Sequence, residues 1–308
     1  MLADFTSFLS HELRSSKHTS EAYLRDIRQF VDFHTKGNPD DFDPEGVTIG
    51  DIRHWIGSLA DNGLTATSLR RKIQSLRAFY KWGLKTGRLN MNPASDMILP
   101  KKRKKLPDFI NDKEIESLFD KDRPFSTGKS TSVAFLSSRA DIAVEILYSL
   151  GLRQAELLSL DDSDVNLISK EIKVTGKRNK QRVVPLPSKL ADKIERWQKI
   201  RDDMYPGLKE HKPLLAGPHG RLSKQTLYKI VNQRLSATSS VKKSPHTLRH
   251  TFATAMLNNG ANLDTVREML GHASLSSTQI YTHLSFKELL DNFQQGHPRV
   301  KGRSNKKC

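Results

Sequence analysis

Apolar side chains recur every three or four positions along residues 1–100, which is the spacing of one face of an α-helix. The pattern predicts helices over residues 2–13 and 23–31, and a third over residues 48–59 that ends near the Asp61-Asn62-Gly63 breaker. A fourth helix is predicted over residues 66–85. Its apolar side consists of Leu69, Ile73, Leu76, Phe79, Tyr80 and Trp82. The first hundred residues are therefore expected to form an all-helical domain.

A proline-bounded basic segment, PKKRKKLPDF at residues 100–109, breaks the helical pattern. Such a segment is typical of an extended linker that can lie along a phosphate backbone, although it also resembles a nuclear-localisation patch. The expected organisation is a helical domain (1–100), a basic linker (101–110), a second domain (111–296) and a basic tail (297–308).

The second domain has a mixed pattern. Asn111 and Glu114 have the spacing of a capping box at the start of a helix over residues 112–119. The stretch EIKVTGKRNKQRVVPL has alternating apolar residues on either side of a Gly-Lys-Arg-Asn turn, which predicts two antiparallel strands. The fold class is therefore mainly α, with a small antiparallel β-sheet in a mostly helical second domain.

The remaining helices of the second domain follow from the same periodicity and from helix stop signals. A Ser/Thr-rich loop is expected near residues 125–138, before a helix over 138–150 that stops at Gly151. Further helices are predicted over residues 154–160, 187–203, 223–236, 246–259, 262–270, 277–283 and 285–295.

The net charge narrows the range of possible functions. The formal net charge is +17 with a sequence pI near 9.9, and such an excess favours a polyanionic partner such as double-stranded DNA. The helical domain is nearly balanced, with 13 Lys and Arg against 12 Asp and Glu, so the surplus lies in the linker, the second domain and the tail.

Other classes are not supported. No run of 18 apolar residues is present, so no membrane span is expected, and no secretory signal is visible at the N-terminus. The only cysteine is Cys308, which excludes a disulfide framework and a cysteine-based zinc site and suits the cytoplasm.

A basic stripe lies on the predicted helix over residues 66–85. It consists of Arg70, Arg77, Lys81 and Lys85, which are 7, 4 and 4 positions apart. Such a stripe is either an ordinary solvated face or a surface that follows a DNA backbone. The linker adds three more candidate DNA contacts, Lys101, Lys102 and Arg103.

Candidate chemistry is confined to the second domain. Arg153 lies among leucines in GLRQAELLSL, so it is expected to be half-buried and to need an anion. Lys177 is at the tip of the predicted hairpin, where a lysine is either solvated or able to reach into a site formed elsewhere. His246 and Arg249 share a face at the start of a helix, where backbone N–H groups favour an anion.

His246 and His250 are four positions apart and could also suggest a metal site, but no further ligands accompany them, so no metal is expected. The stretch LGHASLSSTQIYTHL adds His272 and Tyr281. A tyrosine in isolation is an ordinary packing residue, because a phenol with a pKa near 10 is a poor nucleophile at neutral pH. It becomes reactive where cations cluster and a base can take its proton.

Taken together, these residues fit one reaction class, the attack of a tyrosine hydroxyl on a phosphodiester without a metal. Arginines would clamp the non-bridging oxygens and stabilise charge in the transition state, while a histidine or lysine moves protons. No cofactor is needed. The candidate catalytic residues are Arg153, Lys177, His246, Arg249, His272 and Tyr281.

This ordered set resembles the catalytic signature of the tyrosine recombinases, the phage integrase family. Local stretches match as well, namely GLRQAELLSL, TGKRNKQRVVPL, PHTLRHTFATAMLNNG and YTHL. Within the family the chain resembles the bacterial Xer-type recombinases over nearly its whole length. The resemblance implies a SAM-like core DNA-binding domain, a catalytic domain, and a clamp around double-stranded DNA.

The resemblance also implies the mechanism. Tyr281 would form a 3′-phosphotyrosyl link and release a 5′ hydroxyl, and the link conserves bond energy, so neither ATP nor a metal is required. Lys177 is the implied proton donor to the leaving oxygen, and His246 assists proton transfer. Arg153, Arg249 and His272 would hold the phosphate, with Glu156 as an orienting partner.

In this family recombination proceeds in a tetramer on two DNA sites, which could be a homotetramer or include a paralogous recombinase. The implied biological role is chromosome-dimer resolution or the integration and excision of a mobile element, near the nucleoid. Two other functions remain open. One is a type IB topoisomerase-like enzyme that relaxes DNA, and the other is a catalytically silent DNA-binding protein.

Overall fold

The structure is a computed structural model that describes residues 1–11, 17–101, 109–119, 132–176, 179–208, 212–271 and 292–297. The chain separates into two compact units, Met1–Lys105 and Leu106–Cys308. Each unit buries its own hydrophobic core.

The first unit is a set of helices around one aromatic core. Its helices are α1 (Leu2–His11), α2 (Lys17–His34), α3 (Ile49–Asp61) and α4 (Ala66–Lys85), with a 3₁₀ turn at Pro39–Asp41. α2 packs against the other three helices. The largest side chains buried between them are Phe5, Phe30, Trp55, Phe79, Tyr80 and Trp82. The predicted all-helical fold of this region is confirmed.

Local signals in the sequence explain where these helices begin. Thr48 and Asp51 form a capping box at α3, with each residue's side chain accepting a hydrogen bond from the other's backbone N–H. Thr65 caps α4 by accepting a hydrogen bond from the Ser68 N–H. Because α4 has both a cap and a long apolar face, it covers the predicted range of residues 66–85.

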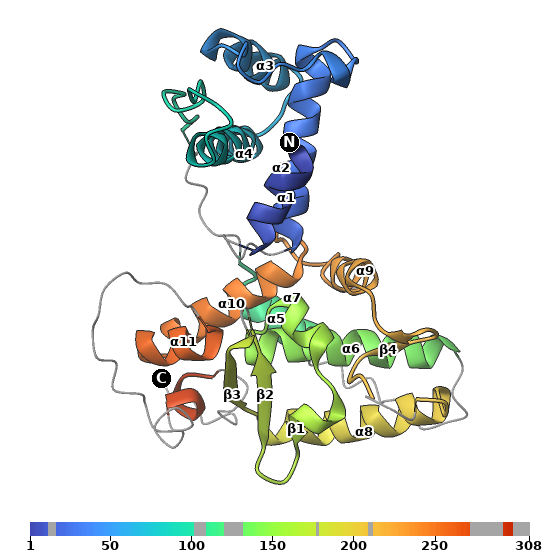
Figure 1. Cartoon of the computed structure of the whole chain (residues 1–308). Helices are drawn as coiled ribbons and strands as arrows, with labels where there is room; N and C mark the ends of the chain where they lie inside the picture. The colour runs from blue at the N-terminus through green and yellow to red at the C-terminus, as the bar shows by residue number, and fades with distance from the viewer. Residues whose placement is uncertain are drawn as a thin grey trace. The chain divides into compact units, whose positions relative to one another are not determined.

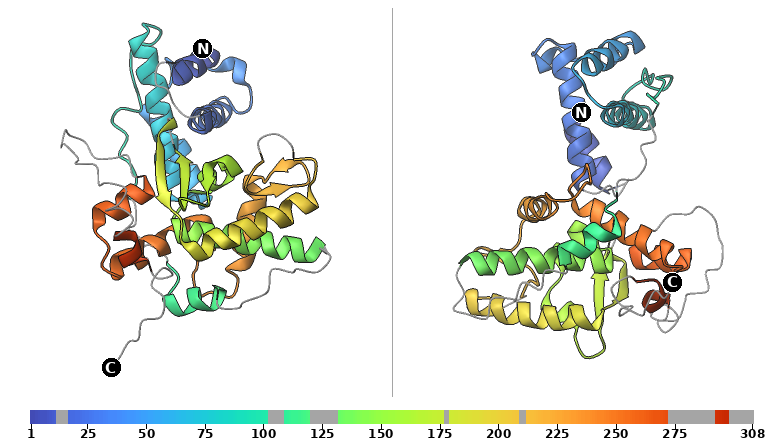
Figure 2. Two further views of the ribbon diagram at one scale, coloured as in Figure 1. Left: turned by 90° about the horizontal axis from the view of Figure 1, so that it is seen from below. Right: turned by 180° about the vertical axis from the view of Figure 1, so that it is seen from behind.

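The second unit is organised around α6 (Ser132–Leu150). α8 (Ser188–Met204) runs alongside α6, and α9 (Lys224–Arg234) and α10 (Pro245–Asn258) pack on it as well (Figures 1 and 2). Every side chain from Ile142 to Leu150 is buried, because neighbours surround this end of the helix. The other helices are α5 (Asp112–Phe119), α7 (Gln154–Ser159), α11 (Leu263–Leu270) and a 3₁₀ turn at Asp162–Asp164.

A small antiparallel sheet completes this unit (Figure 1). Its strands, in the order β1-β2-β3, are β1 (Val165–Asn166), β2 (Glu171–Thr175) and β3 (Gln181–Pro185). Ile172 and Val174 point into the core, as the alternation predicted, and Thr175 pairs with Gln181 at the end of the hairpin. The predicted mainly α fold with a small antiparallel sheet is confirmed.

One prediction needs correction, and one element was not predicted. α6 begins at Ser132, so the expected loop over residues 125–138 is wrong for its last seven residues. Val133 and Leu136 are apolar but 76% and 48% exposed, so the apolar positions at this end of the helix do not mark its buried face. Phe135 anchors this turn by packing against Trp197. A two-stranded hairpin of β4 (Ala216–Gly217) and β5 (Gly220–Arg221) was not foreseen, because two-residue strands leave no alternation.

The predicted helix over residues 277–283 lies outside the described residues, as does the tail from residue 298 onward. Of the predicted helix over residues 285–295, only residues 292–295 are described, and they belong to a helical stretch that continues to residue 296. Among the helices of the described residues, none is both long and apolar enough to cross a membrane.

Candidate active site

Arg153 is positioned by the turn that ends α6. Gly151 has a left-handed φ of 59°, and a Cβ at this position would lie 2.4 Å from the Phe252 ring, so only glycine fits here. The chain can therefore turn sharply beneath α10. It places Arg153 at the N-cap of α7, where its side chain is 42% exposed.

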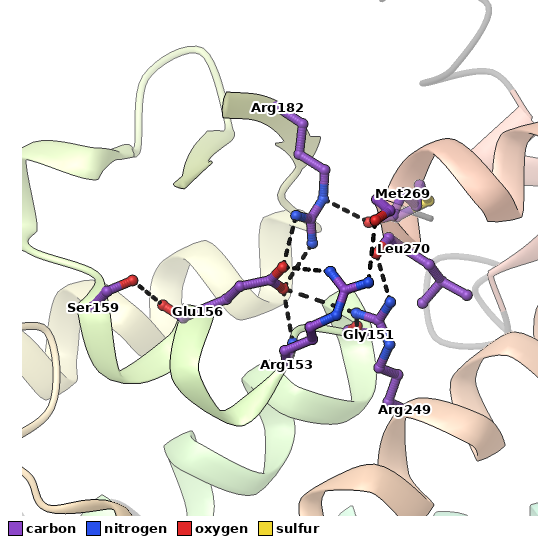
Figure 3. A network of polar contacts seen from close by, with 9 residues as sticks. Gly151, Arg153, Glu156, Ser159, Arg182, Arg249, Met269 and Leu270 are labelled. Atoms are coloured by element: carbon purple, nitrogen blue, oxygen red, sulfur yellow. Dashed lines mark hydrogen bonds and ion pairs between the residues drawn. The ribbon is translucent and has the colours of Figure 1, made fainter. Parts of the chain in front are cut away.

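Glu156 is the anion that Arg153 was expected to need. Its carboxylate is buried and accepts hydrogen bonds from the Arg153 backbone N–H at 2.8 Å and from Arg153 Nη1 at 2.7 Å. Arg182, from β3, adds a two-pronged contact to the same carboxylate at 2.9 and 3.0 Å (Figure 3). Burial raises the pKa of the Glu156 carboxyl, but the hydrogen bonds and charges of these arginines outweigh it and lower the pKa to about 2.

Arg249 comes from the first turns of α10. Ser244 caps this helix and Pro245 starts it, which confirms the predicted helix beginning. The Arg249 side chain is buried and donates to the carbonyls of Gly151 at 2.7 Å and Leu270 at 2.5 Å. Burial, and then the positive charge of Arg153, lower its pKa to about 10, so it stays charged at neutral pH.

These contacts bring three guanidinium groups from α7, β3 and α10 around one carboxylate (Figure 3). Arg249 Nη1 lies 3.8 Å from Glu156 Oε2. The group formed by Arg153, Glu156, Arg182 and Arg249 is called the arginine cluster below. Three cations against one anion leave two positive charges in a partly buried place. Chemically, such a cluster can bind an anion with two negative oxygens and stabilise charge that develops on it.

His246 lies one turn before Arg249 on the same helix. Burial, then the charge of His250, then those of Arg249, Lys242 and Arg153 lower its pKa. The histidine is therefore predominantly neutral at pH 7 and able to accept a proton. Its Nε2 lies 3.0 Å from Nε2 of His250, so the two imidazoles are hydrogen-bonded. The part of the chain that the structure describes contains no group of three or more metal-ligating side chains.

Lys177, His272 and Tyr281 lie outside the described residues. The structure nevertheless describes the residue directly before His272, since Gly271 ends α11 with a left-handed φ of 60°. The Gly271 carbonyl accepts a hydrogen bond from Arg153 Nη2 at 3.1 Å. Of the six predicted catalytic residues, the structure therefore brings Arg153 and Arg249 together, with His246 near enough for their charges to lower its pKa.

Sequence reasoning missed Arg182. An arginine in an alternating strand is normally a solvent-facing residue, and nothing in the local pattern distinguishes this one. Its side chain is only 13% exposed, because it reaches across to α7 and α11. The one local hint was its place within the recombinase-like stretch TGKRNKQRVVPL.

Two arginines of the predicted DNA-contacting stripe on α4 donate hydrogen bonds to backbone carbonyls of the same unit. Arg77 donates to the carbonyls of Ala94, Ser95 and Met97, and Arg70 donates to that of Pro100. These two arginines therefore also hold the segment after α4 in place. Lys102 and Arg103 lie outside the described residues.

Three lysines complete the described part of this surface. Lys81, Lys85 and Lys101 are exposed, and Lys85 lies over the Phe8 ring at 5.5 Å. Lys81 borders an open hollow of about 380 Å³ whose other lining residues are Tyr23, Gln74, Arg77, Ala78, Asn92 and Ser95. The hollow combines cations with amide and hydroxyl groups, which are the side chains that contact DNA backbones and base edges.

Comparison with known proteins finds a family match in each of the two units. The profile described as "Phage integrase family" matches residues 108–288, and "Phage integrase, N-terminal SAM-like domain" matches residues 2–87. A "Tyrosine recombinase XerC" from Chlorobaculum tepidum is 35% identical, over 97% of this chain and 94% of the relative. A "Tyrosine recombinase XerD" from Oceanobacillus iheyensis is 34% identical, over 97% and 98% of the two chains.

Solved structures share the fold. A XerH site-specific recombinase bound to its difH substrate superposes with a TM-score of 0.66 at 22% identity, covering 94% of this chain and 83% of that one. A Tn1549 transposon integrase in complex with a circular-intermediate DNA gives a TM-score of 0.65 at 17% identity, over 89% and 92% of the chains.

Proposed function

The chain belongs to the phage integrase family and is a site-specific DNA recombinase, and from this premise we propose which residues cleave and rejoin the DNA. The enzyme transfers DNA strands through a 3′-phosphotyrosyl intermediate. In our proposal Tyr281 is the nucleophile. The observation that carries the proposal is the arginine cluster, which holds two positive charges in excess beside Gly271, one residue before His272.

Cleavage starts when the Tyr281 oxygen attacks the scissile phosphorus. The bond from phosphorus to the 5′ oxygen breaks, and that oxygen takes a proton from Lys177. His246, neutral at pH 7, accepts the phenol proton. Rejoining reverses these steps, because the 5′ hydroxyl of a second strand attacks the phosphotyrosyl bond and releases the tyrosine. No ATP is consumed, and we expect no metal to be required.

Arg153, Arg249 and His272 would hold the non-bridging oxygens while charge builds on them. Arg153 suits this role because its exposed guanidinium is fixed by Glu156 yet faces solvent. Hydrogen-bond donors that are already in place need no reorganisation free energy when the reaction occurs, and they therefore lower the activation barrier.

The partner of this enzyme is DNA. We propose that four subunits act on two DNA sites, either as one chain or together with a paralogous recombinase, in the cytoplasm at the nucleoid. Resolution of chromosome dimers is the proposed role, because the relatives at 34–35% identity are XerC and XerD proteins matched over at least 94% of their length. Arg70, Arg77, Lys81, Lys85 and the linker residues Lys101, Lys102 and Arg103 are proposed DNA contacts.

The decisive experiment traps the covalent intermediate. Target DNA is first selected from a random pool by binding, and the recovered sites are then nicked close to the cleavage point so that the released 5′ fragment diffuses away. The wild-type protein should form a covalent adduct on denaturing gels, unchanged by a metal chelator. Tyr281→Phe should bind the same DNA and form none. An adduct formed equally well by Tyr281→Phe would show that another residue is the nucleophile.

A two-site assay separates the alternatives. A recombinase exchanges strands between two sites and yields recombinant products, whereas a topoisomerase-like enzyme relaxes supercoils without exchange. A silent DNA-binding protein would give neither product nor adduct.

A further inference from the structure

Arg182 contacts both α7 and the end of α11, although nothing in the proposed chemistry requires it. Its Nη1 and Nη2 donate to the two oxygens of Glu156 at 3.0 and 2.9 Å, and its Nε donates to the Met269 carbonyl at 2.9 Å (Figure 3). All three nitrogens of the guanidinium therefore have protein partners. Hydrogen bonds on two edges fix the plane of the Arg182 guanidinium in one orientation. The Arg153 side chain differs in being more exposed.

The first contact fixes the arginines that hold the phosphate. Glu156 accepts from Arg153 through the oxygen that Arg182 Nη1 also contacts, and Arg249 lies 3.8 Å from the other oxygen. If the carboxylate rotated, the Arg153 guanidinium would rotate with it. The contact between Arg182 and Glu156 prevents that rotation.

The second contact fixes the end of α11. Met269 precedes Leu270, whose carbonyl accepts from Arg249, and Gly271, whose carbonyl accepts from Arg153. Arg182 lies so close to Gly271 that a Cβ there would meet its Nη1 at 2.9 Å. The side chain thus packs directly against the residue that leads into His272.

The third link is through the chain itself. Arg182 pairs with Val174 across the β2–β3 hairpin, and Lys177 comes between these two strands in the sequence. Anchoring β3 to α7 and α11 therefore anchors the base of the hairpin that carries the proposed proton donor. Through Glu156, the Met269 carbonyl and the strand pairing, one side chain thus links described segments that lie next to three proposed catalytic residues: Arg153, Lys177 and His272.

We propose that Arg182 is a positioning residue for strand cleavage, which acts through Glu156 and the Met269 carbonyl and does not itself contact the phosphate. This inference rests on the proposed function of the arginine cluster. It predicts that loss of Arg182 slows the chemical step while DNA binding is retained, since binding uses contacts spread over both units.

A purely structural role is the alternative, and the chain offers a matched control. Arg201 is a buried arginine of the second unit that, like Arg182, donates to one carboxylate with both terminal nitrogens, at 2.7 and 2.6 Å from Asp162. None of the proposed catalytic residues contacts Arg201 in the described part of the chain. A variant at this position reports what the loss of a buried arginine does through stability alone.

The experiment compares Arg182→Met, Arg182→Lys and Arg201→Lys on the nicked suicide site, at a temperature at which all are folded. The first-order rate of adduct formation is measured at saturating DNA, and the Kd is measured separately. We expect Arg182→Met to lose about 100-fold in rate with a Kd within about threefold of wild type, because a misplacement of about 1 Å costs about that much. Arg182→Lys should recover part of the loss, since a lysine supplies the charge but not the fork. Arg201→Lys should keep the wild-type rate within about twofold.

A double-mutant cycle with Glu156→Gln tests whether Arg182 acts through Glu156. In that background Arg182→Met should cost clearly less than 100-fold, because the contact with the carboxylate is already lost and only the one with the Met269 carbonyl remains. An unchanged 100-fold cost there would overturn the inference, and so would wild-type rates in both Arg182 variants. If Arg182→Met does not fold, wild-type cleavage by Arg182→Lys is sufficient to overturn it. Absence of adduct in the wild-type protein is a different result, since it rejects the proposed function itself.

Discussion

Two groups of charges in the second unit, each arranged around a buried ionised side chain, differ in composition. In the arginine cluster, three guanidinium groups surround the single carboxylate of Glu156. In the second group, which we call the Arg201 cluster, Arg201 contacts Asp162 and Asp202, and Lys212 contacts Asp202. The Arg201 cluster is therefore neutral, with two cations and two anions, whereas the arginine cluster has two positive charges in excess.

The pKa values follow this difference. Burial lowers the pKa of both Arg249 and Arg201, but their neighbours act in opposite directions. The charge of Arg153 lowers the pKa of Arg249 further, to about 10, whereas hydrogen bonds to Asp162 and Asp202 raise that of Arg201 above its ordinary value. A cluster whose charges are balanced contributes to the fold. A cluster whose cations repel one another is at its most stable only when an anion joins it.

The largest effect expected from this difference is at Arg249. We expect Arg249→Lys to lower the rate of covalent adduct formation by about 1,000-fold, because a single ammonium cannot replace a guanidinium that donates to two carbonyls and faces a developing charge. The rate is measured on the nicked site at saturating DNA. Arg201→Lys is the matched control, and a loss below about tenfold for Arg249→Lys would place Arg249 outside the reaction.

Most of the fold was predictable because it depends on local signals. α4 and α5 have the predicted bounds, since apolar periodicity and a cap or capping box coincide at their ends. The start of α6 was not predictable, because Val133 and Leu136 face solvent there. The pairing of β2 with β3 was predictable from apolar alternation together with the Gly-Lys-Arg-Asn turn signal between the strands.

The site was predictable only in part, since its arrangement depends on contacts between distant positions. Arg153, His246 and Arg249 were recognisable from residue type and spacing. Arg182 was not, because its partners Glu156 and Met269 are 26 and 87 positions away. Similarly, the stripe on α4 gave no sign that Arg77 would also hold carbonyls 17 to 20 positions further along the chain.

The second prediction concerns acid stability. The pKa of Glu156 is about 2 in the folded protein, below its ordinary value of 4.5, so its charge stabilises the fold above about pH 4.5 and this contribution is lost as pH falls toward 2. Glu156→Gln should therefore cost about 3 kcal/mol at pH 7 and roughly half of that at pH 3. Hydrogen exchange of α6 peptides measures both values in the full chain.

Asp202→Asn tests the same linkage in the Arg201 cluster. Its carboxyl also has a lowered pKa, although burial opposes the hydrogen bonds from Lys212 and Arg201 that lower it. Because the Asp202 side chain is 36% exposed, solvent screens these contacts, and we expect a smaller loss than for Glu156→Gln. An equal or larger loss would show that the composition of the cluster does not set its dependence on pH.

The smallest expected effect is the binding of free phosphate to the arginine cluster in the absence of DNA. With a Kd of about 10 mM, 50 mM inorganic phosphate would stabilise the second unit by about 1 kcal/mol, or a few degrees in Tm, relative to sodium chloride of equal ionic strength. Phosphate also stabilises proteins without binding a site, so the informative quantity is the difference between variants. Arg153→Gln should lose the specific part of the increase. Arg221→Gln should keep it, because Arg221 has similar exposure but is paired with Asp161 and the Leu158 carbonyl, which are not members of the cluster. Equal increases in both variants would mean that two excess positive charges are not sufficient to make a phosphate site, and that the DNA itself must complete it.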